Sequence, residues 1–311
     1  MPRFLSIAIV IIFTAPVLAQ GTAGIRWQND PEQAVAQAKN TKLPLMCYVL
    51  SGEKDRDEKV HSKQNRAFAD PRVVKLSERF VCLKLSRSGH RDKLAQFHLS
   101  PAANMEISFV APADGSQLGD IGPTGVADPV SLAQKMALVF NVHRQRLFDA
   151  ELKPVLENKD AKPADLLAAL GRVRELTILG ADATVAALLD AEGLDAKVVA
   201  SVYDVLAYLS TKASVAKLLE RSPHDPKATE ALGKCTPAGA EMMFEQIHGE
   251  GDTVRLDVYH AVAKICKISS LKADPWWAKA NTTLRNKELE RVGKIVADDA
   301  KRWKALNEDY R

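Results

Sequence analysis

The 311-residue sequence predicts an α/β domain over residues 25–148, followed by an all-α domain over residues 164–311. In the first half, short apolar runs typical of buried strands alternate with stretches of helical periodicity. After residue 163 the strand patterns disappear, and apolar residues recur at the i, i+3, i+4, i+7 spacing of amphipathic helices. This order favours a three-layer α/β sandwich followed by stacked helices.

The first 19 residues are organised like a secretory signal. Arg3 precedes an apolar run over residues 4–13, and the small residue Ala19 stands before Gln20. A membrane anchor is the alternative, but the run is shorter than the ~20 residues that span a bilayer. We therefore expect cleavage after Ala19 and a periplasmic or secreted mature protein without a stable membrane span.

The elements of the first domain follow one another with recognisable start signals. Asp30 and Pro31 predict a helix N-terminus, and Ala34, Val35 and Ala38 continue that helix at the right spacing. The predicted order is then a strand in LPLMCYVL, a helix over residues 55–68, a short helix after Asp70 and Pro71, a strand in FVCLKL, a short helix in RDKLAQFHL, strands in EISFVAP and SQLGDI, and a closing helix over residues 129–147.

This order and two phrases resemble the thioredoxin-like superfamily. The stretch WQNDPEQAVAQAKNTKLPL is similar to a W-x-x-D-x-x-x-A-x-x-x-A-K phrase that leads into the first central strand in one branch of that superfamily. The stretch AFADPRVVKLSERFVCLKL is similar to the helix and strand that come next. The resemblance covers the first domain and implies a thioredoxin-like three-layer sandwich.

The residues that thioredoxin chemistry needs are absent. Active members carry a dithiol at the start of the helix after the first central strand, where this chain has Lys54 and Asp57. Dithiol exchange requires a low-pKa thiolate and a resolving thiol one turn away. Active members also carry a cis-proline before the strand EISFVAP, where Met105 or Glu106 stands here, and neither favours a cis bond. We expect no dithiol exchange.

Other polar residues of the first domain match no catalytic or ligand spacing. The charge run EKDRDEK is explained by acidic side chains that complement the dipole of the following helix. His61, His90 and His98 leave a metal or acid–base cluster as the alternative, although their spacings fit no ligand motif. We predict no catalytic residue, no metal and no cofactor.

The four cysteines are expected to be structural. Cys47 and Cys82 lie in apolar strands, where a free cysteine is typically a small buried residue. Cys235 and Cys266 lie on predicted helices. In an oxidising compartment a disulfide between them is one expectation, and two buried thiols are the other. No pair has C-x-x-C spacing, which excludes the common zinc and dithiol motifs.

The second half predicts helical repeats after residues 149–163, a charged stretch with Pro154 and Pro163 that is expected to be a linker or a frayed helix. TVAALL at residues 184–189 recurs as SVAKLL at 214–219, and VYDVLA at 202–207 recurs as VYHAVA at 258–263. Helices that alternate with Gly-, Pro- and Asp-containing turns indicate stacked hairpins. The phrase GDTVRLDVYHAVAKI resembles the HEAT-like class. Tetratricopeptide repeats and an irregular helical bundle are the alternatives.

Three tryptophans mark the end of the chain. Trp276 and Trp277 follow a proline at a predicted helix start, and Trp303 lies in a final charged helix. A terminal cap of the repeats is the preferred interpretation. The functional alternative is a partner contact, because tryptophan is enriched at binding hot spots.

Composition narrows the class of partner. The net charge of +4 is too small to indicate nucleic acid. An inactive redox domain joined to helical repeats favours a non-catalytic binding or scaffold protein with a protein or peptide partner outside the cytoplasm. The alternative is a thioredoxin-related enzyme, or a redox- or chaperone-associated protein, that uses an unrecognised site.

Overall fold

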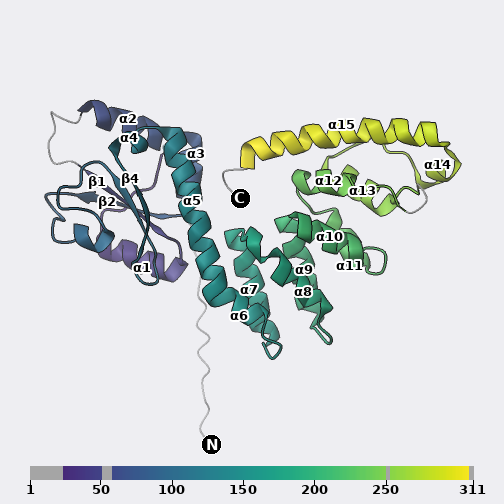
Figure 1. Cartoon of the computed structure of the whole chain (residues 1–311), viewed down its shortest axis with the longest axis horizontal. Helices are drawn as coiled ribbons and strands as arrows, with labels where there is room; N and C mark the ends of the chain where they lie inside the picture. Colours follow the sequence, from purple (N-terminus) through teal and green to yellow (C-terminus); the bar gives the residue numbers. More distant parts are fainter. Residues whose placement is uncertain (1–23, 51–57, 250–252, 308–311) are drawn as a thin grey trace, which may run out of the picture.

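The computed structural model describes residues 24–50, 58–249 and 253–307 (Figure 1). A mixed α/β unit comes first and a helical unit follows it, so the predicted succession of an α/β part and an all-α part is confirmed. The long helix α5 (Pro129–Leu147) runs from the sheet toward the helical unit, as Figure 1 shows.

The sheet has four strands in the order β2-β1-β3-β4. Strand β1 (Leu45–Leu50) pairs in parallel with β2 (Val81–Ser86) and antiparallel with β3 (Ile107–Val110). Strand β4 (Gln117–Ile121) pairs antiparallel with β3 and forms the edge. Strands β1, β3 and β4 lie within their predicted segments, and β2 extends one residue beyond its own, to Ser86.

Helices cover both faces of the sheet. One face packs on α1 (Pro31–Thr41) and the short 3₁₀ turn Leu94–Phe97. The other face packs on α2 (Glu58–Phe68), α3 (Pro71–Ser77), α4 (Pro123–Val126) and α5. Because both faces are buried, β1 is apolar along its whole length instead of alternating with polar residues.

The predicted linker is helical in its first part. After α5 the chain continues through a π-helical turn (Phe148–Leu152) into α6 (Lys153–Leu156). Pro154 lacks the N–H that a regular helix would use, and the wider turn precedes it. Phe148, Leu152 and Leu156 are buried in a core that extends through both units. With regard to the two expectations for residues 149–163, residues 149–156 are helical, and residues 157–162 connect α6 to the next helix.

The helical unit forms two layers of successive helices. The first layer, as we name it, contains α6, α8 (Asp182–Ala187), α10 (Lys212–Arg221), α12 (Pro237–Phe244) and α15 (Thr282–Asn307), each packed on the next. The second layer contains α7 (Pro163–Leu176), α9 (Ala196–Leu209), α11 (Pro226–Leu232) and α13 (Leu256–Ile265). The short helix α14 (Asp274–Lys279) precedes α15.

The repeated sequences occupy equivalent places in these layers. Residues 184–189 and 214–219 lie on first-layer helices, whereas residues 202–207 and 258–263 lie on second-layer helices. A helix of one layer is followed by a helix of the other, so each pair is a hairpin that shares its core with the next pair.

Candidate functional site

A buried network of hydrogen bonds lies around Met105, one of the positions at which the sequence lacks the expected redox residues. Lys54 and Asp57 lie outside the described residues. Met105 is buried just before β3 with a left-handed backbone (φ 56°), and its carbonyl accepts a hydrogen bond from Gln64 Nε2 at 2.7 Å. Gln64 is itself fully buried and accepts the Tyr48 hydroxyl at 2.7 Å. Glu106 is half-buried, and burial together with the nearby Asp120 raises the pKa of its carboxyl.

Sequence reasoning missed Gln64. Gln64 could have been recognised as a polar residue on the buried side of the predicted helix over residues 55–68. A buried amide at such a position must find hydrogen-bond partners. Gln64 Nε2 also donates to the Pro123 carbonyl at 3.0 Å and so connects α2 to α4. The side chain therefore ties three elements together at the carboxyl end of β1.

All four cysteines lie in the described part of the chain, and each is a free, buried thiol. Burial raises the pKa of Cys82 and of Cys235 to about 12 and that of Cys266 to about 11, and it also raises the pKa of Cys47. Such thiols stay protonated at neutral pH and are poor nucleophiles. Of the two expectations for Cys235 and Cys266, the structure has the pair of buried thiols.

The tryptophans pack against the end of the stack. Trp277 is only 4% exposed, and its ring lies 4.8 Å from that of Tyr259 and 4.9 Å from that of Trp276. Trp277 is thus buried within the end of the stack, where its ring packs against its neighbours. Trp276 and Trp303 are half-buried.

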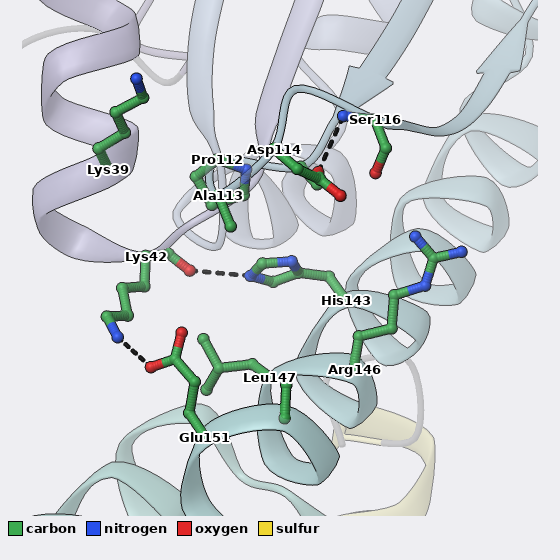
Figure 2. Close-up of a pocket in the computed structure, with 12 residues that line it drawn as sticks. Lys39, Lys42, Pro112, Ala113, Asp114, Ser116, His143, Arg146, Leu147 and Glu151 are labelled. Carbon is green, nitrogen blue, oxygen red and sulfur yellow. Dashed lines mark hydrogen bonds and ion pairs between the residues drawn. The ribbon is translucent and has the colours of Figure 1, made fainter.

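A cavity of about 320 Å³ lies in the first unit, at the end of the sheet opposite Met105 (Figure 2). Its walls are the C-terminal end of α1, the turn between β3 and β4, the end of α5 and the π-helical turn. Gly115 adopts a left-handed conformation (φ 71°) in the β3–β4 turn, which glycine tolerates best. The lining residues are Lys39, Lys42, Ala111, Pro112, Ala113, Asp114, Ser116, His143, Arg146, Leu147, Ala150 and Glu151.

His143 is the most buried polar side chain of this cavity, at 5% exposure. Its Nε2 lies 2.8 Å from the carbonyl oxygen of Lys42, which ends α1 in a left-handed conformation. Burial lowers the pKa of His143, and the positive charges of Arg172 and Arg146 add to this effect. The ring is therefore neutral at pH 7. Lys42 also pairs with Glu151, as Figure 2 shows.

Two further cavities open along the first layer of helices. The larger, of about 760 Å³, lies between α6, the start of α7 and the segment that follows α8. Its apolar lining includes Leu156, Leu166, Leu188 and Leu194. The second, of about 440 Å³, is lined from α10 and α12, by residues that include Val215, Leu219 and Met242.

A charge network joins these two cavities. Lys217 Nζ contacts Asp190 at 2.9 Å and Glu220 at 3.0 Å. Asp190 lines the larger cavity and Glu220 lines the smaller one. Arg221 also pairs with Asp190. The hydrogen bond from Lys217, together with that from Arg221, lowers the pKa of the Asp190 carboxyl. We refer to the two cavities and this network as the two-cavity surface.

His90 and His98 have separate hydrogen-bond partners. His90 Nδ1 accepts the Ser86 N–H at 3.2 Å, and His98 Nε2 lies 2.7 Å from the Gly115 carbonyl. Within the described ranges, no three His, Cys, Asp or Glu side chains are arranged to hold a metal ion.

Comparison with known proteins adds no family. No protein-family model matches the chain, and no curated protein is found to be similar to it. Among the described helices, none combines the length and apolar character needed to cross a membrane.

Proposed function

We propose that the protein is an exported, non-catalytic binding or scaffold protein. In this proposal a redox-inactive thioredoxin-like domain precedes a HEAT-like stack of helical hairpins. The strand order β2-β1-β3-β4, with only β1 and β2 parallel and helices on both faces, supports the thioredoxin-like assignment. The two layers of alternating helices, with the repeated sequences at equivalent places, support the HEAT-like assignment.

The two-cavity surface is the observation that carries the proposal. Stacks of helical hairpins bind their partners along extended surfaces made by successive repeats. Here the surface runs from α6 to α12 and combines apolar floors with charged side chains at the rim. Apolar pockets surrounded by polar groups are typical of sites that take side chains from a protein or peptide. Buried, protonated thiols argue against the redox alternative.

Site-specific photocrosslinking tests this proposal. Ala187 and Ala216 are exposed residues that line the larger and the smaller cavity, respectively. A photoreactive amino acid at either position should give a discrete crosslinked species with an extracytoplasmic protein of the host. Ala168, exposed on the second-layer helix α7, is the matched control. Equal labelling at all three positions, or none at Ala187 and Ala216, would contradict the proposal.

A further inference from the structure

We propose that the cavity of Figure 2 is a binding site for a small, neutral aromatic molecule or side chain that carries one hydrogen-bond donor, such as a phenol. His143 Nδ1 is the acceptor in this site. The proposal concerns the first unit and is independent of the two-cavity surface on the helical unit.

The walls of the cavity are mainly apolar. Its volume of about 320 Å³ lies at the lower end of the range for small-molecule sites. Four elements contribute to it, and the apolar lining residues are Ala111, Pro112, Ala113, Leu147 and Ala150. These side chains leave space for a body of the size of one aromatic ring with a short substituent.

The hydrogen bond to Lys42 determines which nitrogen of His143 can receive a ligand. A carbonyl oxygen only accepts, so the contact of 2.8 Å requires that Nε2 carries the proton. In the neutral ring Nδ1 then presents a lone pair. Nδ1 has no hydrogen-bond partner among the residues that the structure describes, although the side chain is 95% buried and lines the cavity. A donor on a ligand in the cavity can therefore form a hydrogen bond with Nδ1.

The charges around the cavity favour a neutral ligand. Lys42 pairs with Glu151, and Arg146 lies close enough to Asp114 to contribute to the lowered pKa of that carboxyl. Lys39 is the remaining charged residue of the lining, and Arg172 of α7 reaches the carbonyl of Thr41 just outside it. The lining thus has one positive charge in excess, but its charged side chains are exposed or half-exposed to solvent, so a ligand that carries a full charge would gain little over water.

The probe that tests this site is p-cresol, and 4-methylanisole is its matched control because methylation removes the donor and keeps the ring. We expect saturable amide shifts at Ala113, Gly115 and Leu147 in the NMR spectrum of the full mature chain at pH 7.5. p-Cresol should bind about five- to ten-fold more tightly than 4-methylanisole, as expected for one hydrogen bond.

Two variants separate the pocket from its acceptor. Ala150→Trp places a large side chain at an exposed lining position and should abolish binding of both probes, whereas Ala168→Trp on α7 should have no effect. His143→Phe keeps a ring and removes the acceptor, so it should remove the preference for p-cresol. The proposal is overturned by equal affinities for the two probes, by an absence of saturable shifts, or by unchanged binding to the Ala150→Trp variant. If His143→Phe fails to fold, the Ala150→Trp result still decides.

Discussion

Replacing Gln64 by leucine tests whether the hydrogen bonds of this buried amide stabilise the first unit. The variant removes the donor to the Met105 carbonyl at 2.7 Å and the acceptor of the Tyr48 hydroxyl at 2.7 Å. The Pro123 carbonyl loses one of its two donors and keeps its helix bond from Ala127. A buried polar group that loses its partner costs roughly 1–3 kcal/mol. The Met105 carbonyl loses this donor and the Tyr48 hydroxyl loses one hydrogen bond, so we expect the free energy of unfolding to fall by about 1–3 kcal/mol.

The measurement is urea unfolding followed by tryptophan fluorescence, since Trp27 lies 5.6 Å from the Tyr48 ring. A double-mutant cycle supplies the control. Tyr48→Phe should cost less in the Gln64→Leu background than in the wild type, with a coupling of about 1 kcal/mol, because the shared hydrogen bond is already lost. Strictly additive effects, or a Gln64→Leu protein as stable as the wild type, would refute this reasoning.

Three further predictions follow from buried groups. Thiol titration of the native protein should detect none of the four cysteines within minutes, and urea should expose all four without any reductant; a reductant requirement would reveal a disulfide instead. In urea unfolding, Arg291→Ala should destabilise the protein by about 1–3 kcal/mol, since it leaves the buried Glu288 carboxylate without its charged partner. The control is Lys294→Ala, which breaks an exposed ion pair and should cost less than ~0.5 kcal/mol. Burial lowers the pKa of His143 in the folded protein below 6.5, so the unfolded chain binds more protons than the folded one. The free energy of unfolding should therefore fall as pH drops below about 6.5. A wild-type pH profile that matches that of His143→Phe would contradict this.

Local signals allowed much of the fold to be predicted. Asp30 caps its helix by accepting the N–H groups of Glu32 and Gln33, and Asp70 caps its helix by accepting that of Arg72. Proline stands in the first turn of both helices, as the sequence pattern indicates. The closing helix over residues 129–147 was predicted with the bounds of α5. Caps and helical periodicity involve residues that are close together in the chain, so they can be predicted without a tertiary structure.

The candidate sites depended on contacts that no local pattern contains. His143 meets the Lys42 carbonyl 101 positions away, and Lys217 meets Asp190 from the neighbouring hairpin. The charged stretch after α5 resembled a linker because its polar residues outnumber the apolar ones that pack inward. The burial of Trp277 against Tyr259 cannot be seen from one helix alone.

The sequence by itself determined that this chain has an α/β part and a helical part, and that no two of its cysteines have C-x-x-C spacing. These are statements about residue identity and periodicity. Only the tertiary structure decided that the cysteines are buried, that an uncharged histidine faces a cavity, and that a charge network joins two cavities on the helices. Burial and pKa depend on which distant segments pack together, because desolvation and hydrogen bonding act through space and not along the chain.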